Sequence, residues 1–225
     1  MNQTKNLIIV GDSAFAEVAY ECFTHDSEYN VVAFAVESKY RNKDELFGLP
    51  VIDFETMEEK FSPKNYEVYA ALVYSQLNRL RTRLMNDAKQ KGYTLASYIS
   101  SRAFVWSNVK LGEHVFIFED NTLQPFVEIG SNAVIWSGNH IGHHSVIRNN
   151  VFISSHVVLS GFVEVKDNCF LGVNSTISNN LIIEKDCWIG PGVVVVKDTQ
   201  VGQFYKPVIE QAAKISTYRY FRLEE

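Results

Sequence analysis

Four of the six histidines in this chain of 225 residues lie close together, between positions 140 and 156. They are His140, His143, His144 and His156. Histidine is the side chain whose ordinary pKa lies nearest neutral pH, so an accessible histidine can serve as a general base. Neutral imidazole is also a frequent zinc ligand. This segment is therefore the first place in the chain where chemistry is expected.

The segment that contains these histidines belongs to a longer repeat built of hexads. Every sixth position from residue 111 to residue 195 is aliphatic, fifteen times without a break. An unbroken period of this length is typical of a hexapeptide β-helix, in which three successive hexads close one triangular coil. The hexad pattern over residues 109–196 therefore predicts about five stacked coils with the aliphatic side chains inside. These positions are Leu111, Ile117, Leu123, Ile129, Ile135, Ile141, Ile147, Ile153, Leu159, Val165, Leu171, Ile177, Ile183, Ile189 and Val195.

The hexad register also predicts where the histidines lie on a coil. His143 and His144 fall between the inward positions Ile141 and Ser145, at a corner of the triangle. A corner side chain can project into a groove between subunits, whereas an inward side chain cannot. The register leaves the roles of His140 and His156 open.

Residues 1–99 follow a different pattern, in which apolar strands alternate with helical segments. The chain begins with a buried strand (K-N-L-I-I-V-G) that ends at a glycine, and a helix opens directly after it. This alternation predicts a small parallel, Rossmann-like sheet with helices on its faces. We therefore expect an α/β domain over residues 1–99 and a β-helix domain over residues 100–225. Strands are expected at 5–11, 31–36, 66–74 and 94–99, and helices at 13–23, 55–61, 76–91 and, capping the last coil, 210–223.

The turn after the first strand is a candidate phosphate site. Gly11, Asp12, Ser13 and Ala14 stand where a dinucleotide fold carries G-x-G-x-x-G, but only the first glycine is present, which argues against NAD. A helix N-terminus at the carboxyl end of a sheet still favours phosphate. From the turn alone, ligand binding and a packed domain that binds nothing explain the sequence equally well.

The end of the second predicted strand adds two polar residues to the same sheet edge. Glu37 is placed to accept a hydrogen bond from a ribose or a base, and Ser38 follows it. We therefore include both residues in the candidate nucleotide site.

The composition excludes several classes of protein. The formal net charge is −5 and the sequence has no basic run, so a nucleic-acid partner is not expected. It has no apolar stretch of about 18 residues and no signal peptide, so we expect a cytoplasmic protein without a membrane span. The three cysteines Cys22, Cys169 and Cys187 form no C-x-x-C pair, which argues against both disulfides and zinc. Cys169 and Cys187 are separated by three hexads and should stack as reduced thiols on successive coils.

A small sheet domain beginning I-I-V-G, followed by a hexapeptide β-helix, resembles the bacterial sugar acetyltransferases of the sialic acid O-acetyltransferase family. It is most similar to the members that acetylate nucleotide-linked 4-amino-4,6-dideoxy sugars, and the resemblance covers residues 5 to about 200. It implies a left-handed coil and a homotrimer with active sites between subunits. It also implies acetyl-CoA along the β-helix and a dTDP-, UDP- or GDP-linked amino sugar held by the sheet domain.

The resemblance also implies roles for individual residues. The family pattern [N/E]-H-[D/E]-C-V-I matches G-H-H-S-V-I at residues 142–147, so His143 takes the position of the general base. Gly161 matches the position whose backbone N–H faces the acetyl carbonyl. Two departures stand out. His144 replaces the usual acidic residue, although it remains a candidate catalytic residue, and Phe152 replaces a second histidine that many relatives carry.

Three classes of function follow from these features. The first is transfer of an acetyl group from acetyl-CoA to the amino group of a nucleotide-linked amino-dideoxy sugar, for lipopolysaccharide or another surface glycan, with sugar O-acetylation as a variant. The second is a zinc-dependent carbonic anhydrase, in which His143 and His144 would converge poorly on one metal, so no metal is expected. The third is a scaffold or sugar-binding protein that has lost the chemistry, which the departures at His144 and Phe152 motivate.

Overall fold

In the computed structural model, which describes residues 4–207 and 212–224, the N-terminal part of the chain forms a six-stranded sheet in the order β3-β4-β2-β1-β5-β6. The four predicted strands are parallel, and a fifth parallel strand, β4, was not predicted; the edge strand β3 pairs antiparallel with β4, so the sheet is mixed. Phe47 and Gly48 form the two-residue turn of this hairpin, and both have positive φ, as such turns require. The strands are β1 (Lys5–Val10), β2 (Tyr29–Val36), β3 (Glu45–Leu46), β4 (Leu49–Asp53), β5 (Tyr66–Ala70) and β6 (Thr94–Leu95).

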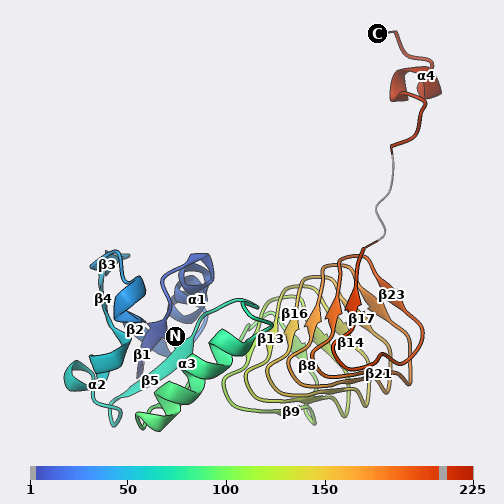
Figure 1. Cartoon of the computed structure of the whole chain (residues 1–225). Coiled ribbons are helices and arrows are strands. Elements are labelled where there is room, and N and C mark those ends of the chain that lie inside the picture. The colour runs from blue at the N-terminus through green and yellow to red at the C-terminus, as the bar shows by residue number, and fades with distance from the viewer. Residues whose placement is uncertain (1–3, 208–211, 225) are drawn as a thin grey trace.

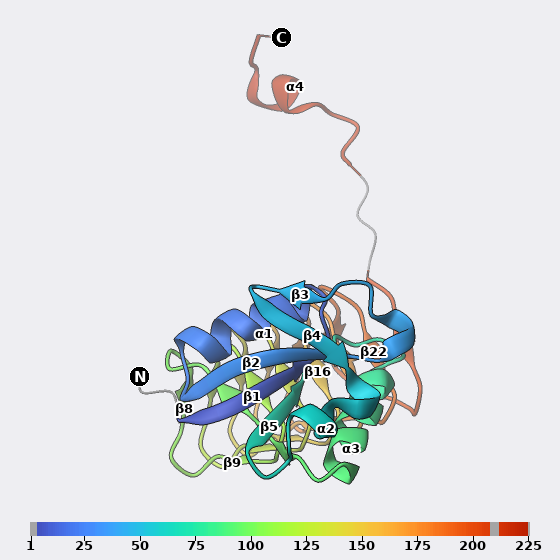
Figure 2. The same cartoon turned by 90° about the vertical axis from the view of Figure 1, so that its left-hand side faces the viewer.

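The two faces of this sheet are covered by different parts of the molecule. Helix α1 (Ala14–His25) and one side of the β-helix cover the first face, where Phe15 and Phe23 pack against Phe116. The second face is covered by η2 (Phe54–Thr56), α2 (Met57–Lys60) and α3 (Arg79–Gln90), and a further short 3₁₀ helix is η1 (Ser38–Tyr40). Figure 2 shows the sheet in front of the β-helix with these helices around it. The β-helix thus shares with α1 the layer that covers this face of the sheet.

The β-helix consists of three parallel sheets that form the sides of a triangular stack (Figure 1). Residues separated by three hexads are hydrogen-bonded neighbours in successive coils. The first sheet contains β7 (Tyr98–Ile99), β10 (Phe116–Ile117), β13 (Val134–Ile135), β16 (Phe152–Ile153), β19 (Phe170–Leu171), β22 (Trp188–Ile189) and β24 (Phe204–Tyr205). The second contains β8 (Phe104–Val105), β11 (Thr122–Leu123), β14 (His140–Ile141), β17 (Val158–Leu159), β20 (Thr176–Ile177) and β23 (Val194–Val195). The third contains β9 (Lys110–Leu111), β12 (Glu128–Ile129), β15 (Val146–Ile147), β18 (Glu164–Val165) and β21 (Ile182–Ile183).

The predicted hexad core is confirmed. Fourteen of the fifteen aliphatic positions are at most 3% exposed, and the remaining one, Leu111, is partly buried. The stack also extends beyond the predicted range at both ends, from β7 to β24. The strand predicted over 94–99 is divided, because β6 belongs to the α/β sheet whereas β7 starts the first sheet of the β-helix. Cys169 and Cys187 are buried free thiols inside the stack.

The C-terminal helix differs from its prediction. Helix α4 (Thr217–Phe221) is much shorter than the predicted 210–223, and residues 208–211 lie outside the described residues. Its side chains are exposed, and Figure 1 shows it well away from the coils. The single chain therefore does not show this helix packed on the last coil. In residues 4–207 and 212–224, no helix combines the length and apolar character needed to cross a membrane.

Candidate active site

The corner between the second and third sheets carries the predicted catalytic histidines. We call this the distal corner, because it is opposite the first sheet, on which the α/β domain packs. It contains residues 124–127, 142–145 and 160–163 of three successive coils, together with their equivalents in the other coils. His143 and His144 are both exposed there, as the hexad register predicted.

An aromatic column holds His144. Its ring stacks between Phe126, at 4.5 Å between centroids and 25° between planes, and Phe162, at 4.8 Å and 14°. These three residues occupy equivalent positions of successive coils, and all have left-handed backbone conformations, with φ of 67°, 59° and 60°. A left-handed conformation costs a residue with a Cβ about 1–2 kcal/mol. Both phenylalanines are also more than half exposed, at 55% and 52%. The column is thus a solvent-accessible stack. Neither the usual burial of phenylalanine nor its usual backbone conformations explain why it is there.

His143 is held from several sides beside this column. Its Nδ1 lies 3.1 Å from Nδ1 of His144, and its ring stands edge-on to Phe162 with centroids 5.1 Å apart. The backbone N–H of His143 donates to Oε1 of Gln124 in the preceding coil at 2.9 Å. The imidazole therefore has a defined orientation in the unliganded chain.

Gly161 lies directly against the ring of His143. A Cβ at this position would lie 2.8 Å from Cε1 and 2.9 Å from Nε2 of His143, closer than such atoms approach in real structures. Glycine is thus required by space rather than by backbone conformation. The N–H of Gly161 makes no hydrogen bond within the described part of the chain. The structure brings together His143, His144 and Gly161, and it leaves one free N–H donor beside the imidazole.

The candidate nucleotide residues lie at the carboxyl edge of the sheet, around an apolar cavity of about 190 Å³. Gly11, Asp12, Ser13 and Glu37 line this cavity. The two remaining candidates do not: Ala14 starts α1 on the surface, and Ser38 donates both its N–H and its hydroxyl to Glu55. The other lining residues are Val10, Ala35, Val36, Tyr40, Leu72, Leu80 and Leu84.

Tertiary folding brings basic side chains to this edge that the sequence analysis did not single out. Lys43 donates to the carbonyl of Asp12 at 3.0 Å and lies 3.6 Å from its carboxylate. Arg83, from α3, pairs with Glu37 at 2.8 Å. Neither residue is part of a local motif, so only the packing of α3 and of the loop after η1 reveals them. The edge therefore combines a helix N-terminus, which favours phosphate, with two cations that are each paired with a carboxylate of the same edge.

A second corner, between the third and first sheets, joins the two domains, and we call it the proximal corner. Arg81 of α3 is fully buried there, and no carboxylate in the described residues pairs with it. It donates instead to Oδ1 and the backbone oxygen of Asn132 at 3.0 and 3.1 Å, and to the carbonyl of Leu72 at 3.1 Å. Burial lowers its pKa to about 10, so the guanidinium remains charged at neutral pH.

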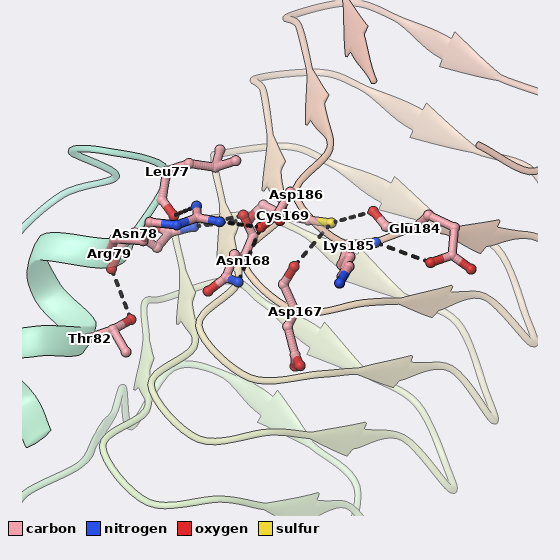
Figure 3. Close-up of polar contacts among 10 residues, drawn as sticks. All are labelled: Leu77, Asn78, Arg79, Thr82, Asp167, Asn168, Cys169, Glu184, Lys185 and Asp186. Atoms are coloured by element: carbon pink, nitrogen blue, oxygen red, sulfur yellow. Dashed lines mark hydrogen bonds and ion pairs between the residues drawn. The ribbon is translucent and has the colours of Figure 1, made fainter. Parts of the chain in front are cut away.

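Figure 3 shows the upper part of the same corner, where the start of α3 meets the coils. Asn78 donates to the carbonyl of Cys169 at 3.2 Å, and Arg79 pairs with Asp186 at 2.7 Å. Asn168 donates to the same Asp186 carboxylate at 3.2 Å. These contacts and those of Arg81 connect α3 to several coils, so the nucleotide edge and the β-helix are rigidly related.

The remaining histidines have other surroundings. His114 is buried at the proximal corner, where Nε2 accepts from the N–H of Ala70 at 2.8 Å and the ring stacks on Tyr69 at 4.4 Å. Burial lowers its pKa to about 3. His156 is exposed at the third corner above Gly138, and His140 faces outward from β14. Across residues 4–207 and 212–224, no three His, Cys, Asp or Glu side chains are grouped to hold a metal ion.

The departure from the family pattern at Phe152 has a structural explanation. Phe152 lies in the first sheet and packs between the domains, with Tyr74 at 5.2 Å and Phe170 at 5.8 Å between ring centroids. The guanidinium of Arg81 lies 5.8 Å from its ring centre. In this chain the position thus belongs to the interdomain core and not to the distal corner.

Comparison with known proteins agrees with this fold. The family model described as hexapeptide repeat of succinyl-transferase matches residues 127–155 and 163–197. No curated protein matches the chain significantly. Perosamine N-acetyltransferase from Caulobacter crescentus, solved with CoA and GDP-perosamine, is 24% identical with a TM-score of 0.78, over 90% of this chain and 94% of that one.

Two further solved structures are similar over nearly the whole chain. The acetyltransferase domain of PglB from Neisseria gonorrhoeae, solved with acetyl coenzyme A, is 18% identical with a TM-score of 0.72, over 92% of this chain and 97% of that one. WeeI from Acinetobacter baumannii is 21% identical with a TM-score of 0.69, over 89% and 96%. The predicted architecture, an α/β domain followed by a left-handed hexapeptide β-helix and a short C-terminal helix, is therefore confirmed.

Proposed function

We propose that this hexapeptide-repeat protein, which shares its fold with sugar N-acetyltransferases, transfers an acetyl group from acetyl-CoA to the amino group of a nucleotide-linked amino-dideoxy sugar. The observation that carries the proposal is the juxtaposition of the His143 ring with the free N–H of Gly161 at an exposed corner. A general base beside an unpaired amide donor is the minimum that acyl transfer to an amine requires.

The proposed reaction assigns one role to each of these groups. The sugar amine attacks the thioester carbonyl, and Nε2 of His143 takes the proton that the nitrogen loses as the C–N bond forms. The N–H of Gly161 donates to the oxyanion of the tetrahedral intermediate. Collapse of the intermediate breaks the C–S bond, and the proton on His143 goes to the leaving thiolate of CoA. A positioned base contributes about 10²–10⁴-fold to such a step, and one oxyanion donor about 10²–10³-fold.

The carboxyl edge of the α/β sheet is our candidate for the nucleotide. Asp12, Ser13 and the start of α1 offer N–H groups, and Lys43 offers a cation beside them. Gly11 permits the turn, because its φ is +117° and a Cβ there would lie 3.0 Å from the carbonyl of Ala71. The solved perosamine N-acetyltransferase contains GDP-perosamine, which supports a nucleotide sugar as the acceptor.

The arrangement of the two sites supports a homotrimer with active sites between subunits. The nucleotide edge belongs to the domain that packs on the first sheet, whereas His143 lies at the corner opposite that sheet. A sugar held at the edge would therefore reach the histidine of a neighbouring copy more readily than that of its own chain. Acetyl-CoA and nucleotide sugars are cytoplasmic metabolites, so we place the reaction in the cytoplasm, in the synthesis of lipopolysaccharide or another surface glycan.

The test measures release of free CoA from acetyl-CoA with dTDP-, UDP- and GDP-linked 4-amino- and 3-amino-dideoxy sugars as acceptors. His143→Ala is expected to lower kcat by about 10² or more. Gly161→Ala should lower kcat similarly, because the added Cβ displaces the imidazole. Asn179→Ala is the matched control, since it changes the equivalent corner position one coil later. Undiminished turnover in His143→Ala, or failure of the wild-type chain to bind acetyl-CoA, would contradict the proposal.

A further inference from the structure

His144 stands where the resembling enzymes carry a carboxylate, and the structure indicates what it does there. We propose that His144 is a positioning residue: a neutral imidazole whose Nδ1 accepts a hydrogen bond from Nδ1–H of His143, leaving Nε2 of His143 free as the base. This inference rests on the proposed function for its consequence in catalysis. The hydrogen bond itself is a property of the unliganded protein and can be tested without any substrate.

The geometry restricts the pair to two arrangements. At 3.1 Å between the two Nδ1 atoms, one nitrogen must carry the shared hydrogen and the other must accept it. If His144 donated, the neutral His143 would carry its own hydrogen on Nε2 and could not take a proton there. If His143 donates, Nε2 has a free lone pair. Because that nitrogen lies against Gly161, the second arrangement places the base beside the oxyanion donor.

The aromatic column explains how an exposed corner can hold an acceptor still. Phe126 and Phe162 sandwich the His144 ring, so the stack opposes rotation of the ring about its Cβ–Cγ bond. The ring planes of His143 and His144 are 89° apart. The equivalent left-handed backbones of these three residues keep the rings in register along successive coils. A carboxylate in the same place would need no such stack, because both of its oxygens can accept.

The electrostatic consequence distinguishes this pair from a histidine–carboxylate pair. A carboxylate would stabilise protonated His143 and raise its pKa, whereas a neutral imidazole adds no negative charge. Among the described residues, the other ionisable side chains on or directly after the neighbouring strands are His140, before the corner, and five that form ion pairs after it. These pairs are Lys110–Glu128, Arg148–Glu164 and Lys166–Glu164.

Three variants separate the acceptor from the stack. His144→Phe keeps the stack and removes the acceptor, and it should fold because phenylalanine already occupies this backbone conformation in both adjacent coils. His144→Asn keeps an acceptor in a residue that tolerates the left-handed region, as at Asn180 one coil beyond Phe162. His144→Asp restores a carboxylate. The matched control is Asn180→Phe, which changes the same column at its next position.

The expected results differ for each variant. His144→Phe should lower kcat by about 10–100-fold, as loss of an orienting partner does for other histidines, with KM for acetyl-CoA within about twofold. His144→Asn should recover most of that loss. His144→Asp should be active but should move the acid limb of the kcat/KM profile upward by about one pH unit or more. Equal activity of the Phe and Asn variants, or an unmoved acid limb in His144→Asp, would overturn the proposal.

A spectroscopic measurement tests the hydrogen bond independently of activity. Nitrogen-15 NMR of the full chain, assigned through the His143 and His144 variants, reports which ring nitrogen is protonated. We expect His143 protonated on Nδ1 and His144 on Nε2 at neutral pH. The reverse tautomers would refute the pairing. If the expected tautomers were found but no acceptor sugar were acetylated, the proposed function would fail while the pair itself would stand.

Discussion

The distal and proximal corners have the same backbone conformation but carry different kinds of side chain. Both recur once in every coil, and at each corner one residue has a left-handed conformation in several successive coils. At the proximal corner most of these residues suit that conformation; at the distal corner the coil before His144 and the coil after it carry phenylalanine. The proximal residues are His114, Asn132, Asn150, Asn168 and Asp186, and the distal ones are Phe126, His144, Phe162 and Asn180.

The difference separates structure from function. Asparagine and aspartate tolerate the left-handed region, and at the proximal corner the side chains of Asn132 and Asp186 also bind Arg81 and Arg79 of the neighbouring domain. The stacked aromatic rings of the distal corner gain none of these contacts and remain exposed. Residues in an unfavourable conformation without a packing reason are concentrated at functional sites. The distal corner is therefore where we place the chemistry.

The two corners can also be compared through a single residue type, because His114 lies at the proximal corner and His144 at the distal one. Both occupy the left-handed position of a corner, with φ of 58° and 59°. His114 is completely buried, stacks on Tyr69 and holds the N–H of Ala70, whereas His144 is exposed and bonds to His143. Only the surroundings of each corner give one histidine a structural role and the other a proposed catalytic one.

The largest expected effect is at the proximal corner. Arg81→Met should lower the free energy of unfolding by about 3–5 kcal/mol, because it breaks a buried hydrogen-bond network and leaves Asn132 and the carbonyl of Leu72 unsatisfied. Arg79→Ala is the control, since its exposed ion pair with Asp186 should contribute less than about 1 kcal/mol. Urea unfolding at one protein concentration measures both. Similar losses in the two variants would mean that the buried hydrogen bonds of Arg81 contribute no more to stability than an exposed ion pair at the same corner.

The second prediction concerns pH and His114. Its folded-state pKa of about 3 lies below the ordinary 6.5, so below pH 6.5 the unfolded chain binds a proton that the native chain does not. Stability should therefore fall with decreasing pH between 6.5 and about 3, by up to about 1.4 kcal/mol per pH unit from this group. His114→Asn should remove this component. The check is the difference between wild-type and variant unfolding free energies at pH 7 and pH 5.

If the unfolding free energies of the wild type and His114→Asn differed by the same amount at pH 7 and pH 5, His114 would be protonated as readily in the folded chain as in the unfolded one. His156→Asn is the control, because His156 is exposed at a corner with the same backbone conformation. Its replacement controls for exchanging a histidine for asparagine at such a corner.

The smallest expected change in unfolding free energy is at the aromatic column. Whether a substitution there raises or lowers stability is the informative result. Phe162→Asn should raise the unfolding free energy by about 1 kcal/mol, because asparagine suits the left-handed backbone better. The same variant should lower kcat several-fold by releasing one side of His144. Asn180→Ala should show the reverse, a small loss of stability with kcat unchanged. A Phe162→Asn chain that is both less stable and fully active would mean that the column is structural.

Much of the distal corner could be predicted from local pattern. The hexad period determines which residues point inward, and three hexads return the chain to an equivalent position, so His143, His144 and Gly161 could be assigned to one corner without coordinates. The aromatic column could have been found in the same way, since Phe126 and Phe162 each lie one coil away from His144. The signal was present in the spacing of these phenylalanines, although an exposed corner is not where apolar rings are expected.

The coil, its inward core and the corner of His143 and His144 follow from the sequence alone, because each depends on contacts at a fixed, short period. The α/β alternation follows from the local strand and helix patterns of residues 1–99. Tertiary structure alone decided the buried position of Arg81, the arrival of Lys43 and Arg83 at the nucleotide edge, the place of Phe152 between the domains, the antiparallel β3 edge and the exposed α4. These depend on pairs such as Arg81 and Asn132, which are 51 residues apart and follow no period. Residues so far apart in an aperiodic part of the chain meet only when whole elements pack.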